Sequence, residues 1–128
     1  MDDKPDIVVL HVGSNNIHDK VNPEILAKDI MNIGKKCIAH GVSEVYISEI
    51  LKRKSMILKG KIVQVYNILS AMCEENDFYF VRNSNITSEY LWRDGLHLQD
   101  SGTEILSYNT TSVLNRRFIQ NSMHNNYI

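Results

Sequence analysis

The sequence has little of several features that place a protein in a specialised class. Its 128 residues include only two cysteines and no apolar run near the roughly 18–20 residues that a transmembrane helix needs. The formal net charge of −1 gives no electrostatic attraction toward nucleic acid or an anionic membrane surface. With 43% hydrophobic and 23% charged residues, the composition is that of one soluble globular domain without clear nucleic-acid binding.

The scarcity of cysteine also bears on metal binding and on the compartment. Cys37 and Cys73 each fall on the apolar face of a predicted helix, which is typical of a reduced core thiol. A zinc site would need closely spaced Cys and His pairs, and none exists. Residues 1–6 lack the apolar core of a secretory signal. These observations favour a cytoplasmic protein, although a preceding segment could carry a signal.

One stretch is locally basic. Its cationic residues are Lys52, Arg53, Lys54, Lys59 and Lys61. Charge runs in globular proteins usually lie on solvated loops and faces, so we interpret this stretch as a loop followed by the start of a helix.

Three short apolar segments alternate with longer segments of helical periodicity. The predicted strands are Ile7–Val12, Glu44–Ile50 and Phe78–Val81. Between the first two strands, Asn22 and Pro23 mark the start of a helix that ends near Gly41. Between the second and third strands, a further amphipathic helix carries apolar residues at helical spacing: Ile62, Tyr66, Leu69 and Cys73. Residues 101–104 form a capping-box pattern that predicts a last helix, and residues 120–128 form a polar tail predicted to be disordered.

This order of elements predicts an α/β fold with a parallel sheet. Right-handed crossovers place the first two helices on one face of a sheet in sequence order, which leaves the last helix to cover the other face. The result is a three-layer α/β/α domain over residues 1–119. Only three strands are predicted, and the first lies at an exposed edge of the sheet although its apolar sequence is typical of a buried strand. An exposed apolar edge strand promotes aggregation. The sequence therefore looks like a fold truncated at its N-terminus.

The tetrapeptide Asp94-Gly95-Leu96-His97 is the first candidate for chemistry. A carboxylate three residues before a histidine can bond the imidazole Nδ1 and leave Nε2 free as a base. Asp-Gly is also a common turn pair, so a plain turn is the alternative interpretation.

A second candidate, Gly13-Ser14-Asn15-Asn16, follows the first predicted strand. A side-chain amide at that position can donate to a developing oxyanion, although Gly, Ser and Asn equally favour an ordinary turn. Open parallel sheets build their sites beyond the carboxyl ends of the strands. We therefore expect the segments that follow the first and third strands to meet at one edge. We interpret His11, at the end of the first strand, as a core histidine with a hydrogen-bond partner rather than a site residue.

These two motifs carry a resemblance to a known family. Over about residues 5–119 the chain resembles the SGNH hydrolases, also called the GDSL esterase/lipase family. The Gly13–Asn16 motif is similar to the family's Gly-x-Asn-Asp block, which implies Asn15 as the oxyanion donor. The Asp94–His97 motif is similar to its Asp-x-x-His block, which implies His97 as base and Asp94 as its orienter. Gly102 matches a glycine common after that block. The resemblance implies the flavodoxin-like fold of the family and no metal or organic cofactor.

The chain also departs from the family pattern. The Gly-Asp-Ser block with its nucleophile is absent, and Asn16 replaces the usual aspartate. Ser14 lacks the flanking glycines of a nucleophile elbow, so we do not expect it to replace the missing serine nucleophile. We expect Ser14, together with Gly13 and Asn16, to line the site. The resemblance thus implies the C-terminal part of a carboxylic ester hydrolase, inactive alone, whose substrate is a small-molecule, sugar or lipid ester.

Two other functions are compatible with parts of the sequence. The chain could be a non-catalytic degenerate α/β domain that binds a partner chain through its exposed strand edge, since Ile7–Val12 is apolar throughout except for His11. A small nucleotide-binding module is disfavoured, because no Gly-rich phosphate loop follows the first strand.

Overall fold

The computed structural model describes residues 6–13, 16–53, 55–93 and 97–126. In chain order the elements are β1 (Ile7–Leu10), α1 (Pro23–Ala39), β2 (Glu44–Ser48), α2 (Met56–Glu75), β3 (Tyr79–Val81), the short 3-10 helix η2 (Ser88–Tyr90) and α3 (Asp100–Asn126). The described strands form one parallel sheet in the order β1-β2-β3, with Ile7 opposite Glu44 and Tyr46 opposite Tyr79.

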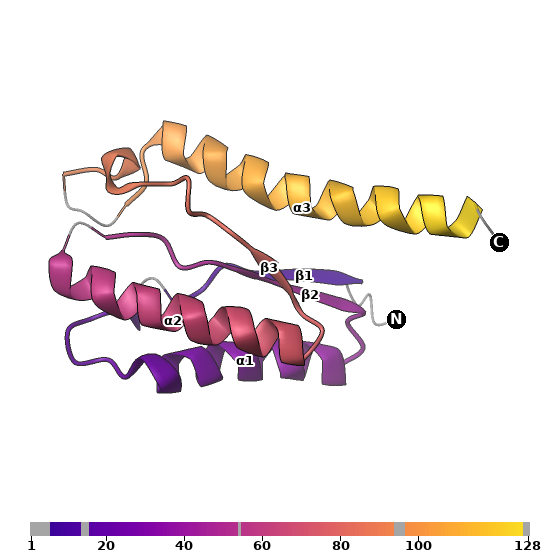
Figure 1. Cartoon of the computed structure of the whole chain (residues 1–128), viewed down its shortest axis with the longest axis horizontal. Helices are drawn as coiled ribbons and strands as arrows, with labels where there is room; N and C mark the ends of the chain where they lie inside the picture. The colour runs from indigo at the N-terminus through magenta and orange to yellow at the C-terminus, as the bar shows by residue number, and fades with distance from the viewer. Residues whose placement is uncertain (1–5, 14–15, 54, 94–96, 127–128) are drawn as a thin grey trace.

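The helices form a layer on each side of this sheet. Figure 1 shows α1 and α2 together on one face and α3 on the other, as right-handed crossovers predict. All three helices begin at the same end of the sheet, which is the end where the strands finish. The three-layer α/β/α arrangement predicted from the sequence is therefore confirmed.

The ends of the elements agree closely with the sequence signals, with small differences. The Asn22 side chain caps α1 by accepting from the backbone N–H groups of Glu24 and Ile25, at 2.9 and 3.3 Å. Gly41 has the positive φ of +98° expected just after a helix. β1 and β2 are each two residues shorter than predicted. Ladder pairing ends at Leu10 in β1 and, opposite Val81 of β3, at Ser48 in β2.

The last helix differs more from its predicted bounds. α3 begins at Asp100, one residue before the Ser101 predicted as its N-cap. The N–H of Thr103 donates to the carbonyl of Gln99 at 3.0 Å, so the first helical turn starts earlier than the capping-box pattern indicates. The helix continues to Asn126, through most of the tail predicted to be disordered. The domain boundary at residue 119 stays a prediction.

The hydrophobic core lies between the sheet and the pair α1 and α2. Side chains alternate along β2, so Val45 and Ile47 join this core at 1% exposure each, together with Leu69 and Cys73 of α2. Burial raises the pKa of the Cys73 thiol to about 11, which keeps it protonated at neutral pH. The expectation of a core thiol at this position is confirmed.

The opposite face of the sheet is covered less completely. Tyr46 is fully buried there and stacks on Tyr79, with ring centroids 4.6 Å apart. The apolar side chains of α3 that face this side are only half-buried: Ile105, Leu106, Val113 and Leu114. Among the described strands β1 pairs with β2 alone, and Ile7 to Val9 stay half-buried. No helix in the described part of the chain combines the length and hydropathy needed to cross a membrane.

Candidate functional site at the carboxyl edge of the sheet

Buried polar side chains gather where β2 and β3 end. Ser48, Glu49 and Asn83 are between 2% and 7% exposed. The Asn83 amide donates to Ser48 Oγ at 2.8 Å and to the carbonyl of Glu49 at 2.9 Å. The backbone N–H of Asn83 donates to Glu49 Oε1 at 2.6 Å. Because buried polar groups are costly unless they are paired, these bonds hold the two strand ends in one fixed arrangement.

The network extends from Asn83 to the last helix. Asn109 of α3 donates to Asn83 Oδ1 at 3.1 Å and exchanges two side-chain hydrogen bonds with Asn85, at 2.8 and 3.2 Å. The segment after β3 is thus tied to α3 by amide pairs. These amide bonds fix α3, which begins three residues after His97, relative to the sheet.

His11 joins the same network from the end of β1. Its Nδ1 lies 3.0 Å from Ser48 Oγ, and because Asn83 already donates to that oxygen, the Ser48 hydroxyl proton is free to bond Nδ1. Desolvation of the buried side of the ring lowers the pKa of His11, while the other side is exposed. That side lines a cavity of about 320 Å³ with hydroxyl-bearing residues of α3. His11 has the expected hydrogen-bond partner, but it is exposed rather than part of the core.

Gly13 and Asn16, the described residues of the first predicted motif, come shortly after β1. Gly13 is buried with a φ of +99°, and the N–H of Asn16 donates to its carbonyl at 3.0 Å. A Cβ on Gly13 would lie 2.9 Å from Ile50 Cδ1 and 3.0 Å from Ile30 Cδ1, so only glycine fits here. Ser14 and Asn15 lie outside the described residues.

His97, the described residue of the second motif, lies between η2 and α3, next to a small antiparallel pairing that we call the hairpin. Leu91 and Leu98 form an antiparallel bridge, and the N–H of Trp92 donates to the carbonyl of His97 at 2.8 Å. The Gln99 side chain donates to the carbonyl of Leu91 at 2.9 Å, which closes the hairpin against the start of α3. The His97 side chain is exposed, as a catalytic base must be accessible to its substrate. Asp94 lies outside the described residues.

Gly102 allows this hairpin to pack on the first turn of α3. A Cβ at this position would meet Leu98 Cδ2 at 2.8 Å, Tyr90 Cβ at 3.0 Å and the Tyr90 carbonyl oxygen at 3.3 Å. Two of these atoms belong to or adjoin backbone and cannot move without shifting the segment that carries His97. Gly102 therefore positions His97 by permitting close approach of two backbones.

We expect Gly102→Ala to lower the free energy of unfolding by about 1–2 kcal/mol through this steric overlap. Gly60 provides the matched control, because it lies within α2 and a Cβ there meets nothing within 4 Å. Gly60→Ala should raise the free energy of unfolding by about 0.5–1 kcal/mol, since alanine is the better helix former. Urea unfolding of both variants measures the difference, and equal effects at the two sites would contradict this role of Gly102.

The described residues of the first motif thus follow the end of β1, and His97 lies three residues before α3. That the two motifs form one site stays a prediction. The sequence reasoning missed Ser48, Glu49, Asn83 and Asn109. A usable signal existed for the first three, because each is a polar residue at or just after the end of a buried strand.

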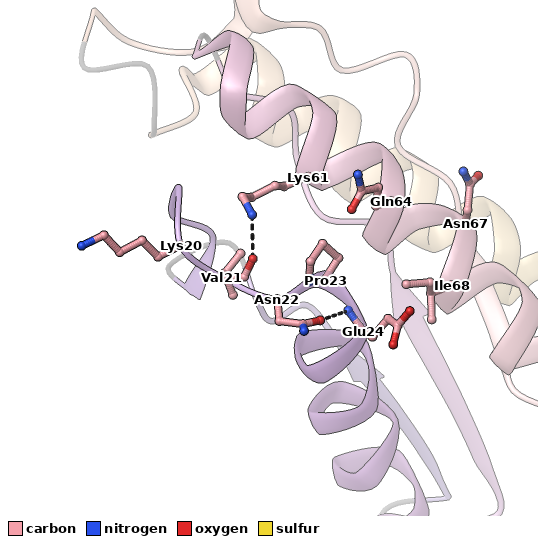
Figure 2. A pocket seen from close by; sticks show the side chains of 9 residues that line it. All are labelled: Lys20, Val21, Asn22, Pro23, Glu24, Lys61, Gln64, Asn67 and Ile68. Carbon is pink, nitrogen blue, oxygen red and sulfur yellow. Dashed lines mark hydrogen bonds between the residues drawn. The ribbon is translucent and has the colours of Figure 1, made fainter.

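Two further observations concern metal ligation and a second cavity. No cluster of three or more His, Cys, Asp and Glu side chains suited to a metal ion occurs among them. A separate cavity of about 710 Å³ between the start of α1 and α2 is lined by none of the candidate site residues. Figure 2 shows that its Lys61 ammonium is bonded to the Val21 carbonyl, at 2.7 Å, and that its Asn22 amide caps α1. Hydrogen bonds within the chain thus already engage two of its polar side chains.

Comparison with solved structures identifies the fold. A putative acylhydrolase from Bacteroides fragilis superposes with a TM-score of 0.76 at 18% identity, covering 88% of this chain and 62% of that one. A GDSL-like lipase from Bacteroides thetaiotaomicron superposes with a TM-score of 0.72 at 15% identity, covering 88% and 63%. The chain has an SGNH/GDSL-type fold. No protein-family model and no curated protein matches the sequence.

The chain spans less than two thirds of the length of either solved structure. At identities of 15–18% the likeness establishes architecture, and the chemistry has to be argued from the residues.

Proposed function

We propose that this chain is part of a serine-ester hydrolase of SGNH type that acts on carboxylic esters. The observation that carries the proposal is positional. β1 ends shortly before Gly13, and His97 lies three residues before α3, which begins at the end of the parallel sheet where the strands finish. This arrangement, in an SGNH/GDSL-type fold, supports a shared site for the two motifs. Exposure of the His97 ring and the tight turn at Gly13 both suit a site open to substrate.

Each candidate residue then has a defined role. A serine from outside this chain attacks the acyl carbonyl, and His97 accepts its proton and later gives it to the leaving alcohol. Asp94 holds the imidazole in the correct tautomer, while Asn15 donates to the tetrahedral oxyanion. Gly13, Ser14 and Asn16 line the site. The reaction needs no metal or organic cofactor, and its substrate is a small-molecule, sugar or lipid ester.

The isolated chain should not hydrolyse p-nitrophenyl acetate measurably faster than its His97→Ala variant. The reason is the missing nucleophile, since losing the catalytic serine costs about a millionfold in turnover elsewhere. Initial rates from p-nitrophenolate absorbance give the comparison. A rate that requires both His97 and Ser14 would overturn this account, because it would make Ser14 the nucleophile.

A positive test uses the open reading frame. Extension upstream by about 60–90 residues, the span of two further βα units, should reveal Gly-Asp-Ser. The extended protein should hydrolyse the same ester, and His97→Ala and Asn15→Ala should each remove most of that rate. Full activity in both variants would refute the assigned roles.

A non-catalytic role is the second candidate, favoured by the unpaired edge of β1. Among the described strands that edge has no neighbour, and Val12 just beyond it is 38% exposed. An additional strand from a partner chain would bury these groups. Size-exclusion chromatography distinguishes the cases, because a monomer at all accessible concentrations argues against a partner at this edge.

A further inference from the structure

The basic stretch of residues 52–61 borders a cavity that the proposed hydrolase site does not use. The cavity has a volume of about 580 Å³ and lies between the first half of α2 and the segments that follow β2 and β3. This volume falls within the usual range for small-molecule sites. Its lining is apolar on one side and cationic at the rim, which is the pattern of an amphipathic ligand site.

The apolar wall comes from one face of α2. Ile62, Val63 and Tyr66 all line the cavity, and Val63 is 57% exposed although its neighbour Ile62 is 5% exposed. The Tyr66 ring packs edge-on against Phe80 with centroids 5.5 Å apart, so its orientation is fixed by the sheet. A ligand chain lying on this wall would remove the exposed valine surface from water.

The rim carries two lysine ammonium groups, of which one donates a hydrogen bond within the chain and the other does not. Lys52 Nζ donates to the carbonyl of Ser84 at 2.8 Å, which anchors it beside the cavity. Within the described part of the chain, the Lys59 ammonium has no hydrogen-bond or ion-pair partner. Glu49 also lines the cavity, but its Oε1 already accepts from the Asn83 N–H at 2.6 Å and from Ser84 Oγ at 3.4 Å. Two cations against one engaged carboxylate leave the rim positive.

We propose that this cavity binds an amphipathic anion with a carboxylate head group and an unbranched acyl chain. The head group pairs with Lys59 and with the remaining donors of Lys52. The chain lies along Ile62, Val63 and Tyr66. A carboxylate fits this rim better than a cationic head group, since the two lysine ammonium groups outnumber the one carboxylate, that of Glu49, among the lining residues. The inference does not depend on hydrolytic activity.

Isothermal titration of the intact chain with sodium decanoate, kept below its micelle concentration, tests the proposal. We expect saturable one-site binding, and we expect Val63→Asp and Lys59→Glu each to weaken it by about tenfold or more. Matched controls lie on α1, where Ile25 is 58% exposed and Lys28 is also exposed. Ile25→Asp and Lys28→Glu should leave the dissociation constant within about twofold.

A probe with the same chain and the opposite head-group charge separates the two parts of the argument. Decyltrimethylammonium should bind at least about tenfold more weakly than decanoate. Circular dichroism verifies that each variant is folded. Absence of saturable decanoate binding, equal binding of both probes, or equal loss in the α1 controls would each overturn the assignment.

Discussion

Replacing Asn83 with alanine should lower the free energy of unfolding by about 3 kcal/mol or more. The amide of this 2% exposed residue makes two donor bonds, to Ser48 Oγ and the Glu49 carbonyl, and accepts one from Asn109. Removal leaves the Ser48 hydroxyl and the Glu49 carbonyl, both in buried residues, each short of a donor. A buried polar group that loses its partner costs about 1–3 kcal/mol, and two such groups plus a small cavity account for the total.

Asn85→Ala is the matched control for this effect. Asn85 also makes two side-chain hydrogen bonds, both with Asn109, but it is exposed. Water replaces its lost partners, so the expected cost is below about 1 kcal/mol. Urea unfolding followed by circular dichroism measures both variants. Equal costs for Asn83→Ala and Asn85→Ala would show that burial of the network does not determine its contribution.

Gly13→Ala should lower the free energy of unfolding by about 2–4 kcal/mol. One part of the cost is conformational, because a φ of +99° is unfavourable by about 1–2 kcal/mol for a residue with a Cβ. The other part is steric, since the new methyl group would press on Ile50 and Ile30 at 2.9 and 3.0 Å. Both isoleucines are buried, at 4% and 3% exposure, and overpacking a core costs about 1–3 kcal/mol.

The Gly60→Ala variant again serves as the control. It separates the dihedral and steric costs at position 13 from any general effect of a glycine-to-alanine change on the free energy of unfolding. It carries the same chemical change at an open helical position and should be stabilising. A D-alanine residue at position 13, introduced by peptide ligation, relieves the dihedral cost, because positive φ is natural for a D-residue. Full stability in Gly13→Ala itself would contradict the turn geometry on which the candidate oxyanion site depends.

Local sequence patterns predicted the strands and helices of the fold. Asn22 and Gly41 marked the ends of α1, and the alternation of apolar strands with amphipathic helices gave the parallel sheet and its layers. Each of these signals depends on a few consecutive residues and on steric rules that hold in any protein. The start of α3 was predicted less well. The bridge between Leu91 and Leu98 fixes the backbone just before Asp100, so the first helical turn begins one residue earlier than the capping-box pattern indicates.

The candidate site was predicted only in part. The two motifs indicated Gly13, Asn16 and His97. In the structure the Gly13 carbonyl accepts from the Asn16 N–H, and the His97 carbonyl accepts from the Trp92 N–H, but a common site of these residues stays a prediction. The roles of Asp94 and Asn15 remain predictions. Ser48 and Asn83 carried only a weak signal, their position at or just after the end of a buried strand, because polar residues at strand ends are common in unrelated settings.

The sequence by itself determined the order of strands and helices, the handedness of their connections and the residues available for ester chemistry, since all of these follow from local periodicity, capping and motif spacing. Only the tertiary structure decided which polar groups pair at the edge of the sheet. Asn83 meets Ser48 across 35 positions of sequence, and His11 meets the same serine across 37. Such contacts depend on the register of parallel strands, which is fixed when the core packs and leaves no periodic trace along the chain.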